Sequence, residues 1–156
     1  MHQPARDGKK LVARNKRALH EYEILETVEA GLVLTGPEVK SVRAGKVALA
    51  DAFARIERGQ AWLHNLHISP YDAASRWNVD PKRPRKLLLN RREIRRLAGA
   101  VTERGYTLVP LDLYFRRGYA KLTLALARGK KLRDRREEIR RREAEREVER
   151  TLRRGR

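Results

Sequence analysis

The sequence contains no cysteine and no long apolar run. Without cysteine, the chain forms no disulfide and offers no thiolate ligand for a metal. No segment approaches the roughly 20 consecutive apolar residues that span a bilayer, and the N-terminus lacks the apolar region of a signal peptide. We therefore expect a cytoplasmic protein with no membrane partner and no cofactor.

Motifs that carry catalysis are missing as well. The sequence has no glycine-rich phosphate loop, no serine nucleophile elbow and no metal-binding helix motif. His64 and His67 are three residues apart on a predicted strand, so their side chains face opposite sides and cannot share a metal. His20 stands near two glutamates, but no spacing there singles out an acid–base pair. We expect that the protein is not an enzyme.

What the sequence has in excess is positive charge. Its 38 Lys and Arg residues face 20 Asp and Glu residues, which gives a formal net charge of +18. The excess is spread over the chain, with three basic segments at 6–17, 82–96 and 129–156. Charge of this size and distribution favours a nucleic-acid partner. Arg outnumbers Lys by 28 to 10, and this bias favours RNA because guanidinium groups bind phosphate in two places and stack on bases.

The C-terminal segment, residues 129–156, is the most highly charged part. Pairs such as Glu138/Arg142 and Glu149/Arg153 are spaced to interact at i,i+4 on a helix. No apolar stripe continues through the segment, so such a helix has little to bury and is marginal by itself. We predict a basic tail that is disordered when free and helical when a polyanion binds it. The alternative is a solvated tail that serves solubility.

The preceding part of the chain is predicted to be mainly β. Residues 1–17 are predicted to form a basic, poorly ordered N-terminal arm. A helix is expected over 38–43 and another from Asn90, which can act as the N-cap with Glu93 as its capping-box partner. A long, exposed basic loop is expected between about 72 and 86. Six strands, mostly joined by hairpins, are expected at 18–27, 31–35, 51–57, 61–67, 106–116 and 119–127. The last two show apolar alternation and are joined by a turn at Arg117 and Gly118; the alternating residues are Val109, Leu111, Leu113 and Phe115 in the first and Leu122, Leu124 and Leu126 in the second. Antiparallel strands in this number close into a small barrel or sandwich.

Several blocks of the sequence resemble one known family. They are LTGPEVKSVRAGK (34–46), HISPY (67–71), the stretch from DP to RKLLLNRREI (80–94), and LVPLDLYF followed by RGYAKLTLALARGKKLRDRR (108–136). Together, in this order and spacing, they resemble the small protein B family of SsrA-binding proteins. The resemblance covers about 15–142.

The resemblance implies a fold and a function. It implies an OB-like antiparallel barrel with two to three flanking helices, at 18–128. It further implies a non-enzymatic adaptor that binds the tRNA-like domain of transfer-messenger RNA and delivers it to stalled ribosomes for trans-translation. The tail, 129–156, would enter the empty mRNA path near the decoding region of the small subunit. We expect a monomer.

The resemblance and the basic segments also suggest site residues. In the family, the RNA-binding face includes the positions of Glu29, Leu88 and Asn90, and the Gly-Lys-Lys run after the last strand. The residues expected to bind RNA are Asn15, Lys16, Arg17, Glu29, Arg85, Lys86, Leu88, Asn90, Arg91, Gly129, Lys130 and Lys131. The tail residues expected to contact the ribosome are Arg133, Asp134, Arg135, Arg136, Ile139 and Arg140.

Other functions stay open at this point. A ribosomal or rRNA-assembly protein would share the basic barrel and the basic tail. A nuclease would need a carboxylate or general base, for which Asp51, Asp112 and His20 are the candidates. An RNA-annealing chaperone is a third alternative.

Overall fold

The computed structural model describes residues 8–71 and 78–154, and within the last helix it describes only the backbone of 131–137 and 154. The described strands are β1 (Lys9–Arg14), β2 (Tyr22–Leu32), β3 (Val47–Ala48), β4 (Phe53–Glu57), β5 (Gln60–His64), β6 (His67–Ile68), β7 (Arg85–Leu88), β8 (Thr107–Arg116) and β9 (Tyr119–Gly129). The helices are α1 (Lys16–Glu21), α2 (Gly36–Arg43), α3 (Arg91–Arg104) and α4 (Lys130–Arg154).

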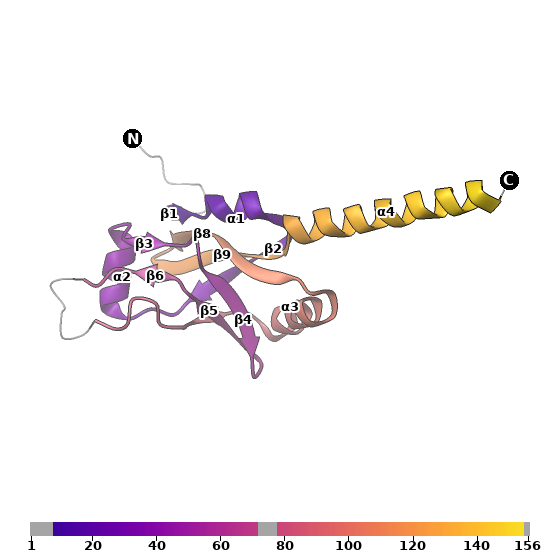
Figure 1. The fold of residues 1–156 in the computed structure, drawn as a ribbon. Helices are drawn as coiled ribbons and strands as arrows, with labels where there is room; N and C mark the ends of the chain where they lie inside the picture. The colour runs from indigo at the N-terminus through magenta and orange to yellow at the C-terminus, as the bar shows by residue number, and fades with distance from the viewer. Residues whose placement is uncertain (1–7, 72–77, 155–156) are drawn as a thin grey trace.

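Six antiparallel strands form a closed ring (Figure 1). Their order is β8-β4-β5-β7-β2-β9, and β9 closes the ring by pairing with β8 along most of its length. β1 lies outside the ring and pairs with the end of β8, from Asp112 to Arg116. β4 pairs with the start of β8 through Ala54 of β4 and Leu108 of β8. The prediction of a mainly β, six-stranded antiparallel barrel is confirmed.

The barrel encloses the main hydrophobic core. Leu122, Leu124 and Leu126 alternate on the inner side of β9, as the sequence pattern predicted, and are at most 6% exposed. The alternation predicted for β8 is wrong in one respect, because a bulge near Leu111 shifts its register. Leu113 therefore belongs to the main core, whereas Val109 packs into a second cluster on the outer side, beneath α1. A bulge next to a proline is expected, since Pro110 cannot donate a ladder hydrogen bond.

The N-terminal region differs from the prediction. Residues 9–14 were expected to be poorly ordered, but they form β1, because the exposed end of β8 satisfies their backbone groups. The strand predicted at 18–27 begins instead with α1, which is capped by Asn15. The two strands predicted at 18–27 and 31–35 are largely one strand, β2, which bends at a bulge between Ile24 and Glu26.

Three short strands were not predicted. β7 lies in the segment that was expected to be loop and pairs with both β2 and β5. β3 and β6 form a separate two-stranded sheet through Val47↔Ile68 and Ala48↔His67. Each of them is too short to show a periodic pattern, and each depends on a partner distant in sequence. The part of the predicted loop at 72–77 lies outside the described residues.

The helix boundaries follow local capping signals. Thr35 and Glu38 form a reciprocal capping box at the start of α2, and Gly45 takes a positive φ of 75° after its end. Asn90 and Glu93 form the predicted capping box of α3, and Leu97 of that helix is 1% exposed. Ala98 and Val101 of α3 line a small cavity with Ala54 and Leu108, so this helix covers the joint between β4 and β8.

The helix α4 extends away from the barrel (Figure 1). Lys130 at its start donates to the carbonyl of Leu19 at 3.2 Å, and Arg142 pairs with Glu138 at 2.8 Å as predicted. The described side chains from Glu138 to Arg153 are exposed. The helical form of the tail agrees with the prediction, and its disorder when free stays a prediction. None of the described helices is long and apolar enough to cross a membrane.

Strand β2 carries three glutamates that each pair with an arginine from later in the chain. Glu23 pairs with Arg128 of β9, its register partner, at 2.8 Å. Glu26 pairs with Arg96 of α3, and Glu29 pairs with Arg116 of β8. These pairs join β2 to three separate elements, α3, β8 and β9.

Candidate nucleic-acid interface

The strand register places several of the predicted residues on one outer face of the barrel. Leu88 of β7 lies opposite Gly31 of β2, which lies opposite Lys121 of β9, which in turn lies opposite Tyr114 of β8. Register partners point to the same side of a sheet, and residues two apart on a strand share that side. Glu29 therefore stands on this side too. We call this side of the sheet, which carries Glu29, Gly31, Leu88, Tyr114 and Lys121, the β2 face; Gly31 and Tyr114 are buried within it.

Leu88 is an exposed apolar side chain at the edge of the β2 face. It is 54% exposed, which is unusual for leucine and contributes little to folding. Gly31 lies beneath it, and a Cβ added at Gly31 would come within 3.1 Å of the Leu88 Cβ. The missing side chain at Gly31 therefore leaves the space in which Leu88 lies. An apolar side chain held at this height above a sheet can pack against a base.

Glu29 is held in place by two donors. The Tyr114 hydroxyl and the Arg116 guanidinium both donate to its Oε2 atom. Burial, and then the hydrogen bond to Glu29 and its charge, raise the pKa of Tyr114 well above its usual range. Lys9 adds positive charge over the Tyr114 ring, 4.2 Å from the ring centre. Glu29 Oε1 has no hydrogen bond with the described residues, so it can accept from an RNA hydroxyl or base N–H.

Asn90 and its neighbours provide donors next to Leu88. The Asn90 side-chain oxygen accepts from the Glu93 backbone N–H at 2.8 Å, so the amide nitrogen is the part that can donate to a ligand. Arg91 is exposed at the start of α3, and half-buried Lys86 lies opposite Trp62 on β5. The cap fixes the Asn90 side chain in one orientation, and Arg91 supplies charge beside it.

Arg85 has a different environment from its neighbours. It is fully buried, donates to Glu38 at 2.6 Å and to the carbonyls of Leu66 and Pro81. Arg83 also donates to Glu38. Burial lowers the pKa of Arg85, although Glu38 opposes the change. With no exposed surface in this structure, Arg85 holds β7 and its loop in position, and this loop leads to Lys86 and Leu88.

Asn15 is likewise buried, in contrast to the two residues that follow it. Its side-chain oxygen accepts from the Ala18 N–H at 3.1 Å, and its amide donates to the Pro110 carbonyl at 2.9 Å. Asn15 therefore fixes α1 against the bulge of β8. Lys16 and Arg17 are exposed, and Arg17 pairs with Glu21 and Asp51 of the same surface.

The start of the tail lies beside α1. Gly129 ends β9 opposite Tyr22, and the exposed Lys130 contacts the carbonyl of Leu19. Ile139 is 49% exposed and Arg140 is exposed, so both are accessible to a partner. The side chains of Lys131, Arg133, Asp134, Arg135 and Arg136 lie outside the described part of the structure.

The structure thus brings the predicted residues into two groups. One comprises Glu29, Lys86, Leu88, Asn90 and Arg91 on or beside the β2 face, and the other comprises Lys16, Arg17, Gly129 and Lys130 at the junction of α1 and α4. Sequence reasoning missed Arg116, Lys121 and Gly31, and it considered Tyr114 only as one of several aromatic side chains that could stack on a base. The alternating pattern of β8 and β9 could have placed Tyr114 and Lys121 outside the barrel, but not beside Glu29, because the pairing of β2 with β9 is not local. No group of three or more His, Asp or Glu side chains suited to a metal lies within the described residues.

Comparison with known proteins identifies the family. The model of the SmpB protein family matches residues 12–154, which is nearly the whole chain. The chain belongs to the SmpB family. The SsrA-binding protein of Carboxydothermus hydrogenoformans is 58% identical over 144 residues, which cover 92% of this chain and 97% of that protein. The SsrA-binding protein of a Geobacillus species is 57% identical over 150 residues, with 96% of each chain covered.

A solved structure is also similar to this SmpB family member. A chain of the structure described as "tmRNA-SmpB: a journey to the center of the bacterial ribosome" aligns with a TM-score of 0.64 at 60% identity. The alignment covers 76% of this chain and 83% of that chain. At this identity, the likeness extends beyond the fold to the sequence.

Proposed function

We propose that this protein binds transfer-messenger RNA and acts with it in trans-translation at stalled ribosomes. The observation that carries this proposal is the likeness to SsrA-binding proteins, at 57–58% identity over at least nine tenths of each chain. The family match continues to residue 154 and so includes the tail. The structural likeness to an SmpB chain in the context of tmRNA and the ribosome supports the same partners. The protein acts as an adaptor in this proposal and catalyses no reaction.

The first contact in this proposal is between the barrel and the tRNA-like domain. Leu88 and Glu29 of the β2 face, together with Asn90, supply an apolar contact, an acceptor and a donor, and Lys86 and Arg91 neutralise phosphates beside them. Lys16, Arg17 and the Gly129–Lys131 run bind the RNA backbone at the second group. Asn15 and Arg85 act by positioning these residues. Such a surface recognises RNA by its shape and backbone, and its affinity falls steeply with salt because bound counterions are released.

The second contact is between the tail and the ribosome. We propose that the barrel at 18–128, with the N-terminal segment 1–17 beside it, binds RNA, whereas the tail at 129–156 enters the vacant mRNA path near the decoding region of the small subunit. The exposed Ile139 and the cations around it are suited to an RNA-lined channel. The tail has few partners within its own domain, so an external partner can order it. The protein would act as a monomer in the cytoplasm.

The experiment that tests this proposal compares two RNAs across a salt series. The full chain and a chain ending at Lys130, which keeps all of β9, are titrated with the tRNA-like domain of tmRNA and with an ordinary tRNA. We expect both proteins to prefer the tRNA-like domain and to lose affinity with salt. In a translation assay stalled on a message without a stop codon, only the full chain should release the ribosome.

Two results would contradict the proposal. Equal affinity for both RNAs would indicate a general basic RNA-binding protein. Full rescue activity by the chain ending at Lys130 would remove the role of the tail. A Leu88→Ala variant gives a site-specific check, because this exposed side chain contributes little to stability but should contribute to RNA affinity.

A further inference from the structure

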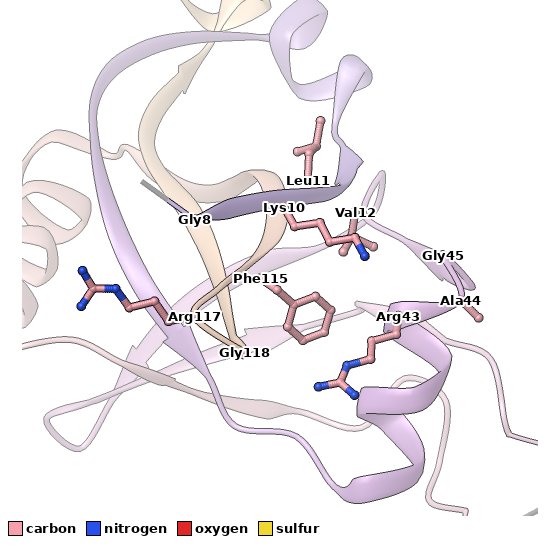
Figure 2. Close-up of a pocket in the computed structure, with 10 residues that line it drawn as sticks. All are labelled: Gly8, Lys10, Leu11, Val12, Arg43, Ala44, Gly45, Phe115, Arg117 and Gly118. Atoms are coloured by element: carbon pink, nitrogen blue, oxygen red, sulfur yellow. The ribbon is translucent and has the colours of Figure 1, made fainter. Parts of the chain in front are cut away.

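A separate cavity lies at the opposite side of β1 from the β2 face. Its volume is about 510 Å³, within the range of small-ligand sites. Figure 2 shows Lys10 and Val12 of β1 above the Phe115 ring and Arg43 of α2 below it. The lining residues are Gly8, Lys10, Leu11, Val12, Arg43, Ala44, Gly45, Phe115, Arg117 and Gly118.

The cavity exists because β1 extends the sheet beyond the closed ring. Lys10 lies opposite Phe115, so the two side chains share the side of the sheet that faces the core inside the ring. Beneath β1 there is no further strand to cover that side among the described residues. The end of α2 covers it only in part, and the cavity is the space that remains.

The charges around the cavity are all positive. Lys10, Arg43 and Arg117 contribute cations, and none of the ten lining residues is acidic. None of the three forms an ion pair with the described residues, in contrast to Arg85 and Arg116, which both bind glutamates. The carbonyls of Lys40, Ser41 and Val42 at the end of α2 accept from the N–H groups of the next turn. The end of α2 brings the negative end of its helix dipole to the cavity, but the three full positive charges outweigh this partial charge, so the cavity is suited to an anion.

Arg43 lies beside an aromatic ring of the core. Its guanidinium carbon lies 5.5 Å from the centre of the Phe115 ring, and Phe115 is itself 7% exposed within the core. Arg43 as a whole is exposed. An exposed guanidinium group beside an aromatic ring offers a surface on which a nucleobase can stack.

We propose that this cavity binds one unpaired nucleotide of single-stranded RNA. The base stacks on Arg43, with Val12 along its edge, and Lys10 binds the phosphate of the same nucleotide. Arg117 points away from Phe115 along the β8–β9 turn (Figure 2), where it binds the next phosphate. Gly45 and Gly118 lie at the rim, and a side chain at either would have open space in front of it, so the entrance is unobstructed. The inference rests on the proposed function only in that RNA is the ligand.

Two pairs of matched variants of the full chain test the base subsite at Arg43 and the phosphate subsite at Lys10. Arg43→Lys keeps the charge and removes the plane, and Arg104→Lys on exposed α3 is its control. Ala44→Glu introduces a negative charge at an exposed position with an ordinary φ of −80°, and Ala44→Gln is its neutral control of the same shape. The probes are a ten-nucleotide uridine RNA, an abasic strand of the same length, uridine monophosphate and inorganic phosphate.

The expected results follow from the chemistry of each subsite. Arg43→Lys should weaken binding of the uridine RNA about tenfold, as expected for the loss of one base stack, and should leave binding of the abasic strand unchanged. Ala44→Glu should weaken both strands by at least about tenfold relative to Ala44→Gln. The methyl resonances of Val12 should shift on addition of the uridine RNA. Shifts of the Val12 resonances at millimolar uridine monophosphate would show that the cavity binds a single nucleotide. The same shifts with inorganic phosphate alone would overturn the proposal that a base stacks on Arg43.

The inference fails if Arg43→Lys and Arg104→Lys have equal effects and the Val12 resonances do not move. Its failure is distinguishable from failure of the proposed function, because binding of the tRNA-like domain is measured separately on the same proteins. A wild-type protein that binds that domain but shows no response at Val12 overturns the cavity alone. A response at Val12 without preference for the domain overturns the proposed function alone.

Discussion

Replacing Glu38 by Gln would test how the buried ion pair holds β7 in the barrel. The Glu38 side chain is 5% exposed and accepts from Arg85, which is fully buried, and from Arg83. Gln keeps the volume and can still accept from the Thr35 N–H in the capping box of α2. The substitution therefore removes the charge with little change in packing.

The expected loss of stability is large because Arg85 remains charged and buried. Breaking a buried pair by removing one partner costs about 3–5 kcal/mol. For a folded part of this size, that corresponds to a decrease in Tm of roughly 10–20 °C. Arg83→Gln, whose side chain is 29% exposed, should cost about 1 kcal/mol or less. Combining Glu38→Gln with Arg85→Met should recover much of the loss, because no unpaired charge is left behind.

Urea unfolding followed by circular dichroism would measure these differences, with the m-value as a check that the unfolding transition is unchanged. A loss below about 1 kcal/mol for Glu38→Gln would refute the reasoning, since it would mean that Arg85 finds water or another partner.

The pH dependence gives a second measure of the same pair. Burial acts to raise the pKa of Glu38, but the hydrogen bonds from Arg83, the Thr35 backbone and Arg85 outweigh it and lower the pKa below its ordinary value of 4.5. The folded state then binds this proton more weakly than the unfolded chain. The stabilisation is complete above the unfolded pKa and is lost as the pH falls through the folded pKa. Wild-type protein should therefore lose more stability than Glu38→Gln between about pH 5 and about pH 3.

Three further substitutions have distinct expected outcomes. Asn15→Ala removes the N-cap of α1 and leaves the Pro110 carbonyl without its donor, so it should cost about 1–3 kcal/mol in urea unfolding; an unchanged midpoint would contradict the role of Asn15. Gly31→Ala forces Leu88 to move, because the new Cβ comes within 3.1 Å of it, so affinity for the tRNA-like domain should fall several-fold with a small change in Tm. Tyr114→Phe should remove a tyrosine that stays un-ionised in a spectroscopic titration to about pH 11, because the pKa of Tyr114 is raised by burial and then by Glu29. Because this pKa is higher in the folded state than in the unfolded chain, the protonated hydroxyl stabilises the fold. That stabilisation is complete below the unfolded pKa and is lost as the pH rises through the folded pKa. Below about pH 11 both proteins should therefore give the same tyrosinate absorbance step, and a smaller step in Tyr114→Phe than in wild type would show that Tyr114 is not protected.

Elements whose signals are local were predicted from the sequence. Alternation over β9, the turn at Arg117 and Gly118, and the capping box of Asn90 and Glu93 each depend on residues within a few positions of one another. The structure has them where the sequence indicated. Both turn residues have positive φ, 52° and 82°, as a two-residue hairpin turn requires.

Elements that depend on distant partners were missed. β7 has four residues and is a strand only because β2 and β5 flank it. Dependence on distant partners also explains why the burial of Arg85 and Asn15 was not predicted. A basic residue in a basic segment favours a surface role, and nothing near Arg85 in sequence indicates that Glu38, 47 positions earlier, will bury it. The exposure of Leu88 follows from register with Gly31, which the sequence alone does not specify.

The glutamates of β2 also bear on how the chain is made. β2 ends at Leu32, and its neighbours β7 and β9 begin only at Arg85 and Tyr119. At typical rates of synthesis, β2 waits roughly 5–20 s on the nascent chain before β9 is complete. An apolar strand with unpaired edges aggregates readily during such a wait, and charged residues within it prevent this. The arginines that pair with the three glutamates are all synthesised after β2, so the charges that later join β2 to the barrel first keep the waiting segment soluble.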